Sequence, residues 1–104
     1  MIQKKFTKTQ CKATFSVSRG IALAGAAVYL VGDFNNWQPE ATPMNRKKDQ
    51  FVITLDLDLN REYQYRYLVN GQEWHNDEAA DKYTPNSFGG ENSVVTTYAE
   101  PVMA

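Results

Sequence analysis

Three stretches of the chain alternate between apolar and polar residues, as expected of β-strands that bury one face and expose the other. They cover residues 11–18, 51–58 and 63–69. In each stretch the apolar residues recur at every second position, so they would all point to the same side of a sheet. The alternation therefore predicts three half-buried strands.

A hairpin is expected directly after the third stretch. Asn70-Gly71 is a strong hairpin signal, because both residues tolerate left-handed backbone conformations. The returning chain would place Trp74 in a short strand opposite the region of Tyr67.

The apolar residues 28–31 are followed by Gly32 and by a polar loop that ends on Trp37. Three of these four residues are β-branched or aromatic, which favours a strand. Gly32 permits a turn that a side chain would hinder, and Asn35 and Asn36 favour turn geometry. Because polar residues precede and follow Trp37, we expect this side chain at the end of a sheet and at least partly exposed.

The eleven-residue apolar run at 21–31 contains Gly25 and is much shorter than the roughly 20 residues of a membrane-spanning helix. Its alanines would suit a short buried helix. Gly20 and Gly25 break its first half, however, so we expect a loop followed by a strand.

Two further segments complete the predicted fold. Residues 76–92 are rich in polar residues, glycine and proline and indicate a long ordered loop, and residues 93–99 resemble a last strand. Six or seven strands without a convincing helix predict an all-β protein, an immunoglobulin-like antiparallel β-sandwich. The predicted core contains Phe15, Val17, Val28, Leu30, Phe51, Ile53, Leu55, Tyr65 and Val94.

The composition restricts the classes of function. A length of 104 residues suits a single domain covering 1–104, and the net charge of −1 gives no indication of binding to nucleic acid or to a membrane. The lone Cys11 cannot form an internal disulfide and falls on the apolar face of its strand, so we expect a small core residue. The first residues lack the apolar stretch of a signal peptide. A cytoplasmic location is expected.

Catalytic chemistry is not indicated. His75 has no recognisable nucleophile context, and the sequence shows neither a phosphate-binding glycine loop nor the spacing of a metal site. The acidic residues Asp77, Glu78 and Asp81 are interpreted as a solvated rim rather than a glycosidase pair or a calcium site. We therefore expect no enzyme activity, no cofactor and no metal.

Several motifs occur together in the order found in one known family. These are Gly-x-Phe-Asn-x-Trp ending at Trp37, the strand at 51–57, the segment from Tyr65 to Gly71, Trp74, and the segment at 88–95. Residues 28–95 thereby resemble carbohydrate-binding module family 48, which includes the glycogen-binding domain of the AMP-activated protein kinase beta subunit and the N-terminal early-set domain of isoamylase. The combination is specific, although each motif alone is weak.

The resemblance implies a module that binds α-1,4-linked glucan, alone or beside a separate glycogen-metabolism enzyme. By position, the two sugar-stacking tryptophans correspond to Trp37 and Trp74, and the hydrogen-bonding basic residue corresponds to Arg66. Asn92 matches the loop asparagine, and Phe88 matches the apolar residue that projects into the ring of sugars.

Three departures from the kinase-subunit pattern stand out. Position 66 is arginine rather than lysine, Gly90 replaces a hydroxyl-bearing residue, and Glu73 is an additional residue before Trp74. The loop at this point is more similar to the isoamylase branch, in which such domains often lie beside a catalytic barrel.

Sugar binding also has a physical basis. A glucose ring has an apolar C–H face for a flat aromatic side chain and a rim of hydroxyls for arginine, asparagine and backbone groups. Alternatively, both tryptophans seal the ends of the sandwich, Arg66 pairs with Asp56 or Asp58, and Asn92 caps the turn before the last strand. The domain would then be a protein-interaction or dimerisation module with little sugar affinity.

Overall fold

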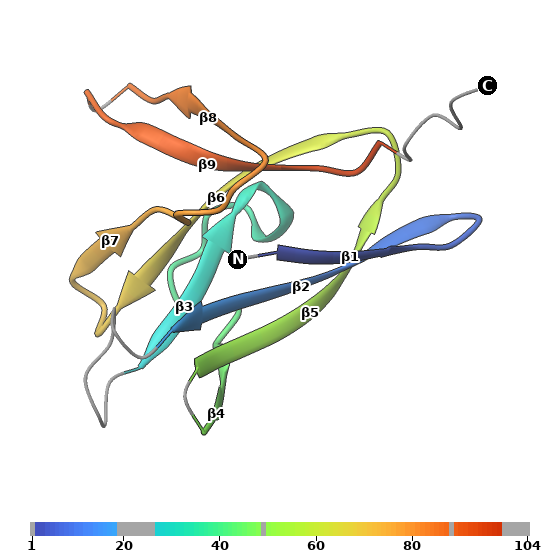
Figure 1. Cartoon of the computed structure of the whole chain (residues 1–104). Helices are drawn as coiled ribbons and strands as arrows, with labels where there is room; N and C mark the ends of the chain where they lie inside the picture. Colours follow the sequence, from blue (N-terminus) through green and yellow to red (C-terminus); the bar gives the residue numbers. More distant parts are fainter. Residues whose placement is uncertain (1, 19–26, 49, 88, 99–104) are drawn as a thin grey trace.

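Two antiparallel sheets pack face to face in the computed structural model, which describes residues 2–18, 27–48, 50–87 and 89–98. Figure 1 shows the two layers and the order of the strands along the chain. The first sheet has the order β1-β2-β5-β4, and its strands are Ile2–Phe6, Gln10–Ser18, Gln50–Asp58 and Asn45–Lys47. The predicted all-β sandwich is confirmed.

The second sheet carries the features that matter for function. Its order is β3-β6-β9-β8, with strands Val28–Gly32, Glu62–Val69, Glu91–Thr96 and Lys82–Pro85. A short strand β7, Glu73–His75, also pairs with β6. The one-turn 3₁₀ helix η1, Asp33–Asn35, follows β3. In the described part of the chain, no helix is long and apolar enough to cross a membrane.

The core lies between the inner faces of the two sheets. Phe15 of β2 and Tyr65 of β6 are fully buried, and their rings meet edge to face with centroids 5.1 Å apart. Phe34 of η1 packs against both rings and closes the sandwich at that end. The core prediction is confirmed for Phe15, Val17, Val28, Leu30, Phe51 and Tyr65.

Three other residues predicted for the core do not lie fully within it. Ile53 and Leu55 are only partly buried, because β4 pairs with β5 only opposite Gln50–Val52 and leaves the edge of the sheet uncovered beyond that point. Val94 is buried but belongs to the outer face, since it pairs with Gln64, whereas its neighbour Val95 enters the core. The inward face of β9 is therefore the one that carries Val95, and the expectation that Val94 lies in the core is wrong.

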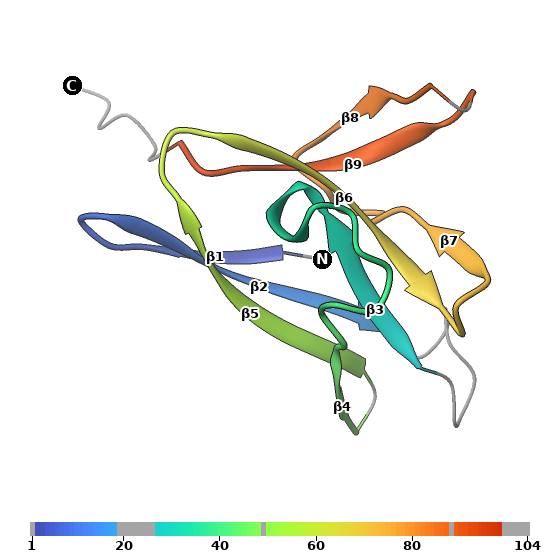
Figure 2. The same ribbon diagram turned by 180° about the vertical axis from the view of Figure 1, so that it is seen from behind.

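Three edge strands were not predicted. β1 pairs with β2, β4 forms in the segment at residues 38–50, and β8 forms within the expected long loop. Figure 2 shows β4 at the margin of its sheet beside β5. Edge strands need few apolar residues, because backbone pairing with one neighbour holds them. The loop expected before β3 falls on residues 19–26, which lie outside the described residues.

The hairpin prediction is confirmed. Asn70 and Gly71 have φ of 55° and 68°, and β7 returns so that Trp74 pairs with Leu68 and His75 pairs with Tyr67. Cys11 is fully buried, and burial raises the pKa of its thiol, which agrees with a small core residue.

Asp77 is not part of a solvated rim. Its side chain is buried, and its Oδ2 accepts hydrogen bonds from the hydroxyls of Tyr65 and Tyr67 over 2.9 and 3.0 Å. Its Oδ1 accepts from the backbone N–H of Ala79 over 2.9 Å. Burial and the nearby carboxylate raise the pKa of both tyrosines well above the ordinary value, so both hydroxyls remain donors. The carboxylate anchors the β7–β8 connection to β6.

Candidate functional site

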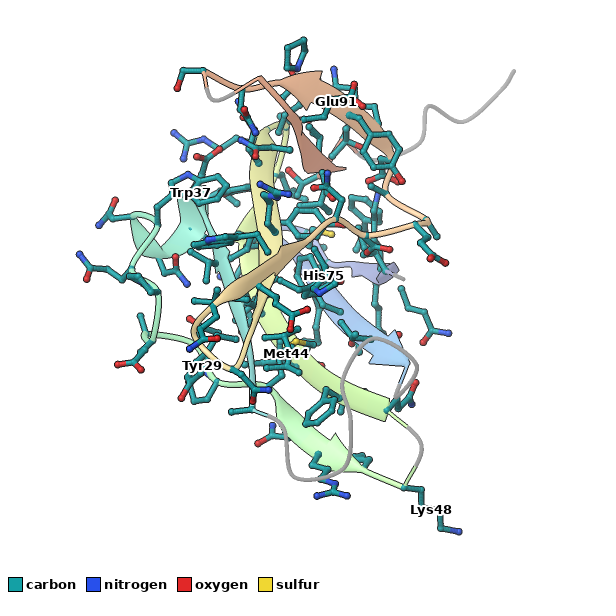
Figure 3. The ribbon with its side chains drawn as sticks, turned by 90° about the vertical axis from the view of Figure 1, so that its left-hand side faces the viewer. Tyr29, Trp37, Met44, Lys48, His75 and Glu91 are labelled. Carbon is teal, nitrogen blue, oxygen red and sulfur yellow. The ribbon has the colours of Figure 1, made fainter. Side chains whose placement is uncertain are left out.

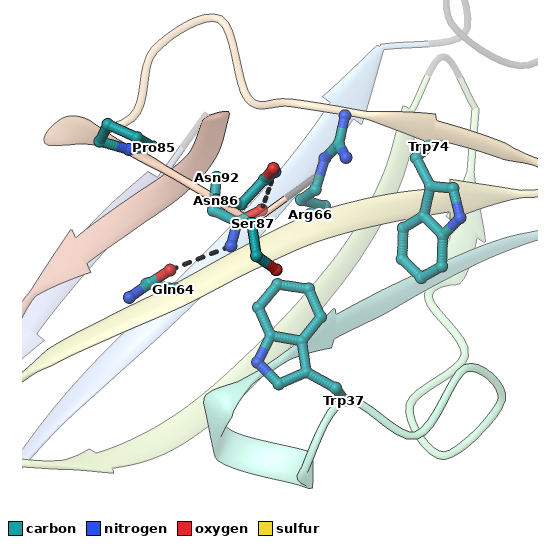
Figure 4. Close-up of a pocket in the computed structure, with 8 residues that line it drawn as sticks. All are labelled: Trp37, Gln64, Arg66, Trp74, Pro85, Asn86, Ser87 and Asn92. Carbon is teal, nitrogen blue, oxygen red and sulfur yellow. Dashed lines mark hydrogen bonds between the residues drawn. The ribbon is translucent and has the colours of Figure 1, made fainter. Parts of the chain in front are cut away.

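A surface hollow of about 740 Å³ lies on the outer face of the second sheet, and aromatic and polar side chains line it (Figure 4). The lining residues are Trp37, Gln64, Arg66, Trp74, Pro85, Asn86, Ser87 and Asn92. The structure thus brings together four of the five predicted site residues, Trp37, Arg66, Trp74 and Asn92. The fifth, Phe88, lies outside the described residues.

Trp37 enters the hollow from the loop after η1. Asn36 and Trp37 have φ of 57° and 58°, so two successive non-glycine residues are left-handed. The backbone N–H of Trp37 donates to the carbonyl of Gly32 over 2.9 Å and closes the turn. Figure 3 shows Trp37 near one end of β3 and Tyr29 at the other. The side chain is intermediate in exposure, as predicted.

Asn35 and Gly32 explain why the chain turns at this point. The Asn35 side chain accepts from the N–H of Gly32 over 3.1 Å and donates to the carbonyl of Leu30 over 2.9 Å. A Cβ at position 32 would overlap the carbonyl oxygen of Gln64 and lie 2.8 Å from the Cβ of Tyr65. Glycine is therefore needed for the close approach of the loop to β6.

Trp74 reaches the hollow from the short strand β7. It pairs with Leu68 and is 41% exposed. Figure 4 shows the indoles of Trp37 and Trp74 extending from different elements toward the same hollow. Because Trp74 is open to solvent, it does not seal the end of the sandwich.

Arg66 is on the same outer face of β6. The suggested ion pair with Asp56 or Asp58 is wrong, because β6 and β5 belong to different sheets. Asp56 instead lies 3.6 Å from Lys12, and Asp58 lies 3.6 Å from Arg61. Within the described residues, the Nε of Arg66 is buried and has no hydrogen-bond partner.

Amide side chains form the polar wall of the hollow. Asn92 donates to Oε1 of Gln64 over 2.9 Å and accepts from Nδ2 of Asn86 over 3.2 Å. The turn before β9 is held by Asn86, which accepts from the N–H of Gly90 over 3.1 Å, rather than by Asn92. Asn92 is therefore a member of the hollow, and among the described residues its side chain bonds to Gln64 and Asn86.

Four lining residues were not anticipated: Gln64, Pro85, Asn86 and Ser87. Gln64 could have been found from its strand, because it precedes Arg66 by two residues and so shares its face. Pro85 is the last residue of β8, and Asn86 and Ser87 belong to the turn that follows it; the sequence pattern indicated only a polar loop there.

These features define a β-sandwich with a surface groove between two tryptophans and a row of hydrogen-bonding side chains, a class of site suited to a ligand with flat apolar faces and a polar rim. The sequence matches the family described as the glycogen recognition site of AMP-activated protein kinase over residues 22–102, and the chain belongs to this family.

Similar proteins include subunits of this kinase. The chain is 39% identical to 5'-AMP-activated protein kinase subunit beta-1 of Sus scrofa over 71 residues, which cover 68% of the chain and 54% of that sequence. It is 38% identical to subunit beta-1 of Homo sapiens and 34% identical to subunit beta-2 of Mus musculus, over 24% and 25% of their lengths. The chain therefore spans between a quarter and about half of these relatives. They are kinase subunits, although the extra Glu73 had suggested the isoamylase branch.

Proposed function

We propose that this domain binds α-1,4-linked glucan in the groove between Trp37 and Trp74, without catalysing a reaction. The observation that carries the proposal is that both indoles line one solvent-open hollow together with Arg66 and Asn92. An aromatic plane suits the C–H face of a glucose ring, and the neighbouring donors and acceptors suit its hydroxyls. Membership of a glycogen-recognition family supports the same ligand class.

The polar groups have specific tasks in this proposal. Arg66 lines the groove, and its guanidinium carries several N–H donors, so a sugar hydroxyl can accept from this side chain. Asn92 is held by Gln64 and Asn86 and can offer its remaining donor and acceptor positions in a fixed orientation. From the family resemblance, Phe88 is proposed to contact the inner side of the glucan.

The protein-docking alternative receives less support. It would be favoured by buried tryptophans and an apolar patch elsewhere, whereas Trp74 is exposed beside polar side chains. The relatives are subunits of a kinase, so we propose that the domain directs a larger assembly to glucan. A glycogen-metabolism enzyme as partner and a cytoplasmic location remain predictions.

Titration calorimetry with maltoheptaose and β-cyclodextrin tests the proposal. Binding should be micromolar to millimolar, roughly −8 to −4 kcal/mol, because a solvated surface site must release water from many hydroxyls. Cellohexaose is the control, since its β-linked chain does not follow the curve of an α-glucan. Absence of heat with every α-glucan at millimolar concentration, together with unchanged tryptophan fluorescence, would contradict it.

A further inference from the structure

The carboxylate of Asp33 connects two walls of the groove, although Asp33 is not among the residues that line it. Its Oδ1 accepts a hydrogen bond from the indole Nε1–H of Trp37 over 2.8 Å. Its Oδ2 accepts from the backbone N–H of Gln64 in β6 over 2.7 Å. Both oxygens of one side chain are therefore used, one on the tryptophan and one on the strand that carries Arg66.

The hydrogen bond from the indole Nε1–H fixes the far end of the ring, and the hydrogen bond from Gln64 holds the carboxylate that accepts it. The near end is fixed by the backbone, where the N–H of Trp37 donates to Gly32 and the residue adopts φ of 58°. The indole N–H is the only hydrogen-bonding group of the side chain, so its direction sets the rotation of the ring. Hydrogen bonds to an ionised carboxylate are stronger than those between neutral groups.

The Asp33 carboxylate also connects the Trp37 indole to the amide side chains of the polar wall. Gln64 donates its backbone N–H to Asp33 and accepts from the Asn92 amide through its side chain. A continuous series of hydrogen bonds thus runs from Trp37 through Asp33, Gln64 and Asn92 to Asn86. It joins the loop after η1, strand β6 and the β8–β9 turn.

We propose that Asp33 is a positioning residue for glucan recognition, which holds the plane of the Trp37 indole at a set distance from β6. The inference rests on the proposed function. A ring that is already oriented loses little rotational freedom when a sugar stacks on it, so pre-orientation strengthens binding. Asp33 itself need not touch the glucan.

Two substitutions test the role while keeping part of the hydrogen bonding. Asp33→Asn retains one acceptor oxygen, but its amide NH₂ must face one of the two N–H donors, so one hydrogen bond is lost. Asp33→Ser retains a short acceptor in case the asparagine variant folds poorly. Asp56→Asn is the matched control, because Asp56 is an exposed aspartate on β5 in the other sheet.

The first measurement is made without sugar. The chain has two tryptophans, so an amide correlation spectrum of ¹⁵N-labelled protein shows two indole resonances, which Trp74→Phe assigns. Asp33→Asn should shift the Trp37 indole resonance and speed its exchange with solvent, while the Trp74 resonance stays in place. A Trp37 indole unaffected by both Asp33 variants would overturn the proposal.

The second measurement is the affinity for β-cyclodextrin. Asp33→Asn should weaken it about tenfold, as expected from loss of a charge-assisted hydrogen bond that orients the ring, and Asp56→Asn should leave it unchanged. In a Trp37→Phe background, which keeps an aromatic ring but lacks the indole N–H, Asp33→Asn should cause no further loss. The positioning role would be refuted if wild type and Asp33→Asn bound β-cyclodextrin equally well. It would also be refuted if Asp33→Asn weakened binding as much in the Trp37 variant as in wild type. A wild type that binds no glucan would instead refute the proposed function.

Discussion

The side-chain amide of Asn92 donates to Oε1 of Gln64 over 2.9 Å and ties β9 to β6 across the polar wall of the groove. Gln64→Ala removes this acceptor and frees the Asn92 side chain to rotate. We expect the affinity for β-cyclodextrin to fall by about three- to tenfold, the effect of one neutral hydrogen bond. Calorimetry on Gln64→Ala measures this, and Gln72→Ala in the exposed hairpin turn is the matched control. Unchanged affinity would mean that glucan binding does not depend on the hydrogen bond between Asn92 and Gln64.

The two tryptophans should carry most of the binding energy. Trp37→Ala and Trp74→Ala each remove a stacking surface, so each should abolish most glucan binding while the fold stays intact. Arg66→Ala should weaken binding less, because it removes hydrogen bonds from a rim that water also reaches. Tyr98→Ala is the control, since Tyr98 is a 49% exposed aromatic outside the groove. Full binding by either tryptophan variant, measured by calorimetry, would contradict the proposed stacking.

The loss of unfolding free energy on truncating a core side chain should increase with the burial of that side chain. Phe15 is fully buried against Phe34 and Tyr65, so Phe15→Ala should cost about 3–5 kcal/mol of unfolding free energy. Ile53 is only partly buried, and Ile53→Ala should cost less, below about 2 kcal/mol. Urea denaturation followed by circular dichroism gives both values. An Ile53→Ala cost as large as that of Phe15→Ala would show that the edge of β5 is covered in solution.

Stability should fall in alkaline solution because of Tyr65 and Tyr67. Burial is the largest cause of the raised folded-state pKa of both tyrosines; the Asp77 carboxylate raises both pKa values further, and Tyr67 also raises that of Tyr65. A group with a raised folded pKa contributes stability that is complete below its unfolded pKa, about 10 for tyrosine, and lost as the pH rises above it. The unfolding free energy should therefore decrease progressively above pH about 10.

Tyrosinate absorbance provides the check. Of the six tyrosines, Tyr65 and Tyr67 should ionise only when the protein unfolds, in step with the loss of the circular dichroism signal. If all six ionised near pH 10 while the sheets remained intact, the buried hydroxyls would not be donating to Asp77 as the structure shows.

The strands with a strict apolar alternation could be read from the sequence. Burial of Phe15, Val17 and Tyr65 follows from a period of two, and the Asn70-Gly71 turn follows from local backbone preference. These features depend on neighbouring residues only. The resemblance to a glycan-binding family likewise identifies Trp37, Arg66, Trp74 and Asn92 as site residues from the sequence alone.

Only the tertiary structure decided which of these residues meet and what holds them. Asp77 is acidic and follows a polar segment, so nothing local indicates that it is buried under two tyrosines. β1, β4 and β8 form because a neighbouring strand offers backbone partners, whatever their own pattern. Asp33 of η1 contacts Gln64 of β6, and Asn92 of β9 contacts the same residue. Hydrogen bonds between residues so far apart in sequence depend on the packing of the sheet, and for that physical reason a linear pattern cannot specify them.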